Sequence, residues 1–399
     1  MPTTMTPARA DGVTPRLRIA VDAGGCRECD GNASLLVIRA GYGLAEEPPA
    51  VLHETSGGRW AMVENNAPIT VLHSLAPPDG TTRYVDQMTD GAPADVRVRY
   101  FSWRVALTGR YDVLHLHWPE FLVRARRRRT RVAKRLAMRV LLWRTRWARI
   151  PIVRTTHNVT PHESGTAAER RLVRAVDRAT TAFIHLNGTT AAPAPGLETV
   201  IAHGHYRDRF AAHPRSDRVP GRILYFGIIR PRKNVEHLID VFLARERPGC
   251  RLRIVGSPTP ELAERIAARI AGHDDVSARL AFVDDDELVA EVTAASLVVL
   301  PYSEMHNSGA ALVALSLDRP VLVPRSPAND ELAREVGPGW VLPFDGTLDD
   351  ADLTAALAAA GAFGDDDRPA LGGRDWDEVG RRHRDVYRAA LDRVRGGSR

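Results

Sequence analysis

The chain has 399 residues, of which 44% are hydrophobic and 26% are charged, and its formal net charge is +6. This length exceeds one ordinary core and predicts about two folded domains, and the composition excludes a mainly disordered protein. Cys26 and Cys29 are neighbours and Cys250 lies far away, so no disulfide framework is expected and a reducing compartment is favoured. No run approaches the roughly 20 apolar residues that span a bilayer, and the N-terminus lacks the apolar core of a signal peptide. We therefore expect a cytoplasmic protein.

Proline and glycine are scattered through residues 1–66, which contain one clear strand candidate at residues 16–21. We predict a poorly defined N-terminal extension there. From Ile69 onward, short apolar runs alternate with amphipathic stretches, which is the pattern of strand and helix units in a parallel sheet. The predicted strands of this first series are residues 69–74, 96–101, 112–117, 152–157, 181–186 and 199–202.

The alternation breaks between Asp208 and Gly221, where the chain is charged and contains proline. A second series of predicted strands follows at residues 222–227, 251–256, 278–283, 297–301, 320–324 and 339–342. The sequence therefore predicts an α/β fold with two doubly wound parallel sheets facing across a cleft, one over residues 67–217 and the other over residues 218–373. Ligands of such sheets bind at the carboxyl ends of the strands, so residues just after each apolar run are the candidates for a site.

A basic loop follows the first strand of the second series and leads into an amphipathic helix beginning at Val235. Arg230 and Lys233 lie where this loop meets the helix, and cations near a helix N-terminus suit a diphosphate. The alternative is a solvated basic turn.

A second candidate element is Asn307-Ser308-Gly309, which follows the strand at 297–301 and opens a helix that runs to about Leu317. Unpaired N–H groups and the helix dipole favour an anion at such a position, and small residues let a phosphate approach the backbone. Taken alone, Asn307 or Ser308 is equally well interpreted as an ordinary helix N-cap. Together, the two elements predict a site for a phosphate-bearing ligand.

These motifs resemble the C-terminal domain of GT-B glycosyltransferases. The resemblance rests on residues 226–239, Arg253-Ile-Val-Gly256, Pro301-Tyr302, Asn307-Ser-Gly309 and Arg319-Pro-Val321, and the similar layout covers about residues 69–392. It implies that the second domain binds a nucleotide-sugar donor, that the first binds the acceptor, and that a last helix within residues 374–399 crosses back to the first domain. The donor-binding residues it implies are Gly227, Arg230, Lys233, Tyr302, Asn307, Ser308 and Gly309.

The Asn-Ser-Gly variant resembles glycosyltransferases of bacterial surface-polysaccharide pathways, including mannosyltransferases that act on lipid-linked oligosaccharides. The resemblance therefore implies transfer of a hexose, such as mannose or glucose, to a glycan or lipid-linked acceptor. Ile228 stands where the large retaining family usually has arginine, and the glutamate pair of that family is absent, so the sequence leaves inversion and retention both open.

We expect neither a metal nor a cofactor besides the donor. Asp284-Asp285-Asp286 fits a helix N-cap with an acidic first turn better than a metal motif. The Cys26 and Cys29 pair has no second pair at zinc-ligand spacing.

Histidine and glutamate gather at two strand ends of the first series. His117, Trp118 and Glu120 follow one strand, and His157, Asn158 and Glu163 follow the next. An inverting transfer needs a base for the acceptor hydroxyl, and His157 is our first candidate, with Glu120 and Glu163 as competitors. Structural hydrogen bonding is the alternative for any one histidine. The predicted acceptor-binding residues are Thr81, Thr82, His117, Trp118, Asn158 and His205.

The segment from Phe121 to Ile150 carries twelve lysines or arginines and no acidic residue. Val132, Leu136, Val140, Trp143 and Trp147 recur within it at helical spacing. Such a helix suits an anionic membrane surface, so residues 124–149 predict peripheral attachment to the inner face of the cell membrane. The alternative is a helix packed on the sheet with a solvated basic face.

Two other functions compete with glycosyl transfer. Arginine runs also neutralise nucleic-acid phosphates, but these occupy one helix and no nucleic-acid-binding motif accompanies them, so we expect no nucleic acid. A nucleotide-sugar epimerase of the same two-lobed design is the alternative enzyme.

Overall fold

The computed structural model describes residues 67–78, 83–157, 165–303, 305 and 309–396, together with three short strands nearer the N-terminus. The chain divides into two compact units, Met1–Ala67 and Pro68–Arg399. In the first unit, β1 (Leu35–Ile38), β2 (Ala50–Glu54) and β3 (Trp60–Met62) form an antiparallel sheet. The strand candidate at residues 16–21 lies outside the described residues.

The first large sheet lies in the second unit and has six parallel strands in the order β5-β4-β6-β7-β8-β9. Its strands are near-continuous apolar runs, as expected for a sheet covered on both faces. The strands are β4 (Ile69–His73), β5 (Val96–Tyr100), β6 (Val113–Leu116), β7 (Ile152–Thr156), β8 (Ala182–His185) and β9 (Leu197–Val200). All six predicted strands of the first series are confirmed to within about two residues.

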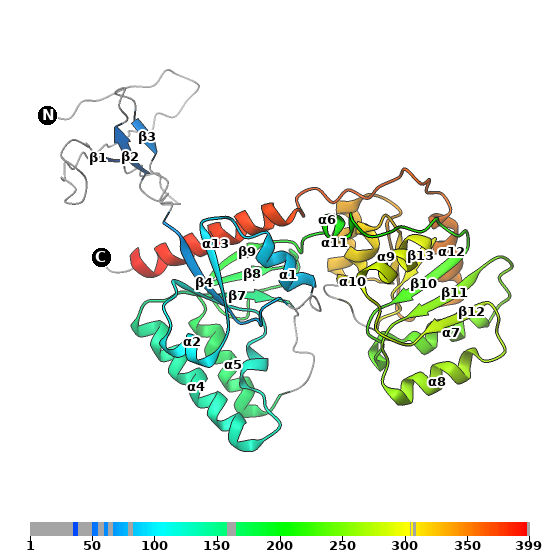
Figure 1. Cartoon of the computed structure of the whole chain (residues 1–399), viewed down its shortest axis with the longest axis horizontal. Coiled ribbons are helices and arrows are strands. Elements are labelled where there is room, and N and C mark those ends of the chain that lie inside the picture. Colours follow the sequence, from blue (N-terminus) through cyan, green and yellow to red (C-terminus); the bar gives the residue numbers. More distant parts are fainter. Residues whose placement is uncertain are drawn as a thin grey trace. The chain divides into compact units, whose positions relative to one another are not determined.

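Helices cover both faces of this sheet (Figure 1). One face packs against α1 (Arg83–Asp90) and the last helix, α13 (Trp376–Gly396). The other face packs against α2 (Trp103–Thr108), α4 (Arg128–Trp147) and α5 (Ala167–Ala179). Two short helices, α3 (Pro119–Val123) and α6 (Arg207–Phe210), follow β6 and β9.

The helix α4 has two unlike faces. Met138, Leu141 and Thr145 are buried, and the two apolar residues among them belong to the core under the sheet. The opposite face exposes all five apolar side chains that the sequence placed at helical spacing, including Trp143 at 65% and Trp147 at 76%. The helix is therefore packed on the sheet and also presents an apolar surface to its surroundings. Among the described residues, no helix combines the length and apolar character needed to cross a membrane.

The second large sheet also has six parallel strands, in the order β12-β11-β10-β13-β14-β15. They are β10 (Arg222–Phe226), β11 (Arg251–Val255), β12 (Val276–Arg279), β13 (Leu297–Val299), β14 (Val321–Pro324) and β15 (Val341–Phe344). The associated helices are the 3-10 turn η1 (Pro231–Lys233), α7 (Val235–Leu243), α8 (Pro260–Ile270), α9 (Asp285–Ala294), α10 (Gly309–Ser316), α11 (Pro327–Val336) and α12 (Asp350–Ala360). The prediction of two doubly wound α/β sheets is confirmed.

One predicted strand was misplaced. The sequence suggested residues 278–283, but the edge strand β12 comprises residues 276–279. It pairs only with β11, and the Arg279 carbonyl accepts its last sheet hydrogen bond, from the Gly256 N–H. Phe282, which made the later run look like a strand, is 68% exposed.

Strand order reverses once within each large sheet. The reversal lies between β4 and β6 in the first sheet and between β10 and β13 in the second. Adjacent loops leave such a point in opposite directions, which opens a crevice at the carboxyl ends of the strands. Both candidate sites of the protein lie at these two positions.

The last helix is held in place by close backbone contact and by side-chain hydrogen bonds. A Cβ atom at Gly380 would lie 1.8 Å from the Gly91 carbonyl oxygen, so only glycine lets α13 approach α1 this closely. Trp376 Nε1 donates to the His205 carbonyl at 2.6 Å, and the Arg374 guanidinium binds Glu335 of α11.

Candidate functional site

Histidines gather at the switch point of the first sheet. His73 is the last residue of β4 and pairs in register with His115 of β6, while His117 and His157 directly follow β6 and β7. His73 Nδ1 lies 3.2 Å from His117 Nε2, and His117 Nδ1 lies 3.1 Å from His157 Nε2. Parallel strands thus place three imidazoles in one hydrogen-bonded row.

The surroundings of this row are aromatic and largely buried. His115 stacks on His117 with 4.3 Å between ring centroids, and its two nitrogens contact the hydroxyls of Tyr387 and Thr155, each at 2.8 Å. Burial, together with the charge of nearby histidines, lowers the pKa of His73 and of His157 to about 3. Burial likewise holds the pKa of His117 well below its ordinary value. These imidazoles are therefore neutral at neutral pH.

Trp118 and His157, two predicted site residues, lie face to face with 4.1 Å between ring centroids. Glu120 of α3 is buried. Burial lowers the pKa of Arg154, and the negative charge of Glu120 acts in the opposite direction. Asn158, Glu163, Thr81 and Thr82 lie outside the described residues. His205 is buried, and its Nε2 contacts Asp375 at 3.0 Å just before α13.

The sequence interpretation missed three residues of this cluster, His73, His383 and Tyr387, and it placed Tyr84 only in a loop expected over the acceptor. His73 ends a predicted strand, so the rule that singled out His117 applies to it as well. Tyr84 lies in the first turn of α1, and its ring lies 5.3 Å from that of His157. His383 and Tyr387 come from α13, more than 200 residues along the chain, and only the fold reveals their position.

Three nitrogens of His73, His115 and His117 lie within 4.8 Å of one another, a spacing that a metal ion could bridge. The hydrogen bond between His73 and His117 argues against that use, because one of its two nitrogens must carry a proton. Asp284, part of the other metal candidate, caps α9 by accepting from the Glu287 N–H at 3.0 Å. The predicted N-cap is thus confirmed.

A glycine pair shapes the switch point of the second sheet. Gly227 follows β10 with a φ of 117°, a conformation that side chains disfavour. A Cβ atom at Gly256 would lie 1.8 Å from the Gly227 carbonyl oxygen. The two loops therefore pack backbone to backbone.

The basic loop after β10 lies against Tyr302 and Ser303, which follow β13. Lys233 Nζ sits 3.2 Å from the ring centroid of Tyr302, and Ser303 donates from its N–H to the Arg232 carbonyl at 3.2 Å. Burial, followed by the charge of Arg232, lowers the pKa of Lys233 to about 8. Arg230 donates to the carbonyls of Ile229 and Ser257 and remains exposed.

A row of aromatic contacts connects the start of α10 with His157. Gly309 opens the helix, and a Cβ atom there would lie 3.5 Å from the Tyr206 hydroxyl. Tyr206 contacts His203, His203 contacts Tyr84, and Tyr84 contacts His157, with ring centroids 5.5, 4.9 and 5.3 Å apart. Asn307 and Ser308 lie outside the described residues.

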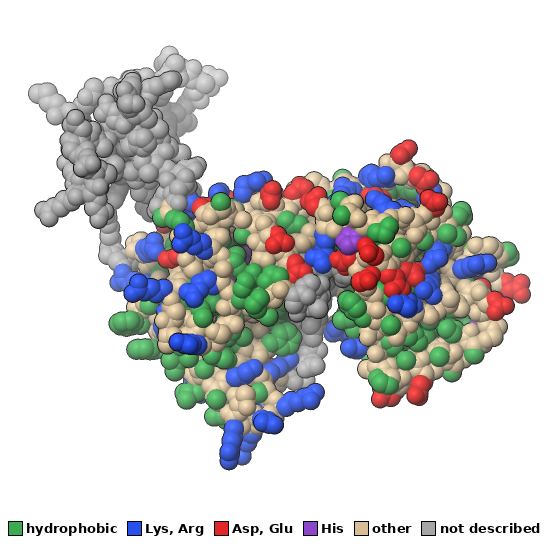
Figure 2. Space-filling model, viewed as in Figure 1, with side chains coloured by type: hydrophobic (Ala, Val, Ile, Leu, Met, Phe, Trp, Pro, Cys, Tyr) green, Lys and Arg blue, Asp and Glu red, His purple; other side chains and the backbone are tan. Residues whose placement is uncertain are grey.

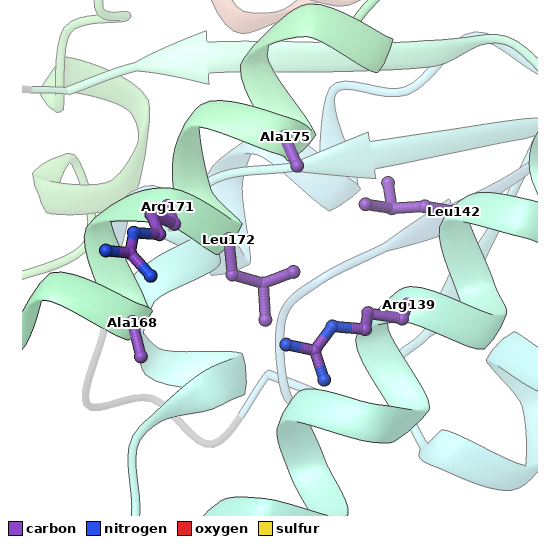
Figure 3. Close-up of a pocket in the computed structure, with 6 residues that line it drawn as sticks. All are labelled: Arg139, Leu142, Ala168, Arg171, Leu172 and Ala175. Carbon is purple, nitrogen blue, oxygen red and sulfur yellow. The ribbon is translucent and has the colours of Figure 1, made fainter.

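A basic surface lies over α4 and α5, away from the sheet edge, where Figure 2 shows many Lys and Arg side chains. A pocket of about 300 Å³ opens between the two helices. Arg139 and Arg171 lie on either side of Leu172 in it (Figure 3). Both arginines are exposed, and no described acidic side chain pairs with either of them. This surface thus offers unneutralised positive charge beside apolar groups.

Known proteins resemble the chain along most of its length. Residues 220–360 match the family model described as glycosyl transferases group 1. A GDP-mannose:glycolipid 4-beta-D-mannosyltransferase of Xanthomonas campestris pv. campestris is 45% identical over 325 residues, which are 81% of this chain and 93% of that protein.

Solved structures show the same fold. HepE of Anabaena in complex with UDP superposes with a TM-score of 0.55 at 14% identity, covering 83% of this chain and 99% of that one. A glycosyltransferase from Rickettsia africae ESF-5 superposes with a TM-score of 0.51 at 11% identity, covering 81% and 99%. The chain therefore belongs to the glycosyltransferases of the GT-B fold, in one family with the Xanthomonas glycolipid mannosyltransferase.

Proposed function

We propose that this glycosyltransferase moves mannose from GDP-mannose to a glycolipid acceptor in surface-polysaccharide or glycolipid synthesis. The observation that carries the proposal is the 45% identity to a protein of that activity, which extends over 93% of the relative's length. Similarity over nearly the whole relative includes both sheets, and hence both candidate sites.

The donor diphosphate would bind at the switch point of the second sheet. Lys233 and Arg230 supply positive charge there, and the helix dipole at the start of α10, beside Gly309, favours an anion. These groups would stabilise the leaving diphosphate without a metal ion. Tyr302 would hold the Lys233 ammonium near the site until a phosphate replaces the ring as its partner.

The acceptor hydroxyl would bind beside His157. A β-linked product from an α-linked donor requires inversion, and inversion requires a base that takes the hydroxyl proton. His157 is neutral at neutral pH, stacks on Trp118, and is linked by aromatic contacts to the start of α10. We therefore propose His157 as that base and Trp118 as a platform for the acceptor sugar.

The test of the proposed function is a transfer assay with purified protein, a lipid extract of the source membranes, and radiolabelled GDP-mannose, UDP-glucose or dTDP-glucose. The proposal predicts that label from GDP-mannose enters the lipid fraction and is released by a β-mannosidase. Label recovered as a free epimerised sugar would support the epimerase instead. Transfer from only UDP-glucose or dTDP-glucose would contradict the donor assignment.

The pH dependence of donor binding tests Lys233. Because the pKa of Lys233 is about 8, the ammonium is mostly charged at pH 7 and mostly neutral at pH 9. Losing that charge should raise the KM for the donor by about tenfold between these pH values. Lys233→Arg keeps its charge throughout this range and should flatten the dependence. The same rise of KM in both proteins would remove the phosphate role of Lys233.

Replacing His157 tests the base. His157→Ala should lower kcat by about 10²- to 10⁴-fold, because the proton then has no acceptor in the site. Donor binding, measured by thermal shift with GDP-mannose, should stay unchanged. Glu120→Gln is the matched variant of the competing base and should keep kcat within about tenfold of the wild type. The reverse ranking of the two variants would assign the base to Glu120.

The basic surface is proposed to hold the enzyme on the inner face of the cell membrane, where a glycolipid acceptor resides. Trp143 and Trp147 lie parallel on the exposed face of α4, with ring centroids 6.2 Å apart. Indole groups flanked by arginines suit the interface of an anionic bilayer. The pocket lined by Arg139 and Arg171 would take a phosphate headgroup beside this apolar face.

Flotation with mixed phosphatidylglycerol and phosphatidylcholine vesicles tests this surface. Trp143→Ser combined with Trp147→Ser should weaken binding on the order of tenfold or more, because two large apolar side chains no longer enter the bilayer. Phe282→Ser removes an equally exposed aromatic ring from the second sheet's edge and should bind like the wild type. Replacing Arg126 to Arg129 with serine should also weaken binding. Unchanged flotation of both α4 variants would contradict membrane attachment through this helix.

A further inference from the structure

Two hydroxyl groups outside the basic loop after β10 bind carbonyl oxygens near its two ends. The Tyr225 hydroxyl, on β10 itself, donates to the Ile228 carbonyl at 3.1 Å. The Ser303 hydroxyl, which follows β13, donates to the Arg232 carbonyl at 3.2 Å, and the Ser303 N–H donates to the same oxygen at 3.2 Å. The two cations of the proposed donor site lie between these attachment points or directly after them.

Tyr225 is fully buried in the core of the second sheet. Burial raises the pKa of its hydroxyl, and a hydrogen bond with the Tyr302 side chain acts in the same direction. The positive charge of Arg230 acts in the opposite direction. One neutral hydroxyl therefore binds the backbone of the basic loop and Tyr302, and it also interacts with the charge of Arg230.

Tyr302 in turn carries Lys233, whose Nζ lies 3.2 Å from the ring centroid. The Tyr302 side chain belongs to the same core as Tyr225 and is only 5% exposed. The attraction between an ammonium and an aromatic ring requires the cation to lie over the ring face. Ser303 keeps the turn in this position, because the Arg232 carbonyl that it binds directly precedes Lys233.

A third contact completes the support of the loop. The Ile229 N–H donates to the carbonyl of Ser257, which follows β11, at 3.2 Å. Residues on or after three neighbouring strands thus hold the loop in one conformation before a ligand arrives. A loop that is already ordered loses less conformational entropy when it binds, and charges that are already in place stabilise a leaving group without reorganisation.

We propose that Tyr225 and Ser303 are positioning residues that preorganise the basic loop, so that its two cations meet the donor diphosphate with little rearrangement of the backbone. Tyr225 acts from the core, and Ser303 acts from the neighbouring loop after β13. The inference rests on the proposed donor site at this loop, and it adds the groups that prepare that site.

The first test is the pKa of Lys233, measured without donor by NMR titration of the full chain carrying ¹³C-labelled lysine. Loss of a signal in Lys233→Arg assigns it, and the wild type should titrate near pH 8. Burial lowers this pKa, so a loosened loop that releases the ammonium into water should raise it toward the ordinary lysine value. We expect this rise in Tyr225→Phe. A smaller rise is expected in Ser303→Ala, whose N–H still binds the carbonyl.

The second test is the affinity for GDP, measured by calorimetry at pH 7. Tyr225→Phe and Ser303→Ala should each weaken binding by about two- to tenfold, the usual effect of losing one hydrogen bond. Ser303→Thr keeps a hydroxyl and should match the wild type in both tests. Tyr111→Phe is the control, because this buried tyrosine of the first sheet also donates to a carbonyl, that of Ala106, at 2.8 Å. It should lower Tm but change neither the pKa of Lys233 nor the affinity for GDP.

An unchanged pKa of Lys233 in both Tyr225→Phe and Ser303→Ala would overturn the inference. An equal loss of GDP affinity in Tyr111→Phe would overturn it as well, and so would full GDP affinity in the two loop variants when Lys233→Ala binds GDP weakly. Failure of the proposed donor site looks different, because Lys233→Ala would then bind GDP as tightly as the wild type. The titration needs no donor and would still report the positioning of Lys233.

Discussion

An imidazole removed from water needs a hydrogen-bond partner for each of its nitrogens, and the carboxyl edge of the first sheet depends on meeting that need. His115 uses Tyr387 and Thr155, His117 uses His73 and His157, and His203 uses the Gly204 carbonyl and the Tyr206 hydroxyl. The same burial keeps these rings neutral by lowering their pKa values. The carboxyl edge of the first sheet is therefore packed like an apolar core, yet it holds neutral imidazoles at the place where a parallel sheet binds ligands.

The last helix covers this edge and buries its histidines. Tyr387 and His383 reach the histidines from α13, and Trp376 contacts Tyr84 and His203 near its start. Close contact at Gly380 and the hydrogen bond from Trp376 to His205 fix the helix on the sheet. The C-terminal segment thus contributes to the chemistry of the first sheet as well as to its stability. The start of α10 lies beside the same arrangement, because the Tyr206 hydroxyl faces Gly309 and contacts His203.

Much of the fold followed from the sequence because each strand is a short apolar run bounded by polar or glycine residues. The strand ends also singled out His117, His157 and Lys233 from the sequence alone, and the family resemblance added Tyr302. The edge strand β12 was misplaced because Phe282 is apolar and yet exposed. The partners from α13 were not predictable, because contacts across more than 200 residues leave no local pattern. Asn158, Glu163, Thr81, Thr82, Asn307 and Ser308 remain predictions.

The proposed chemistry requires that the switch point of the second sheet bind the diphosphate of the donor. A crystal structure of the protein with GDP would show this directly. We expect the β-phosphate to lie within hydrogen-bond distance of Lys233 Nζ and of the backbone N–H groups that open α10, with the ammonium drawn off the Tyr302 ring. A diphosphate bound elsewhere, with Lys233 still resting on Tyr302, would contradict the donor site.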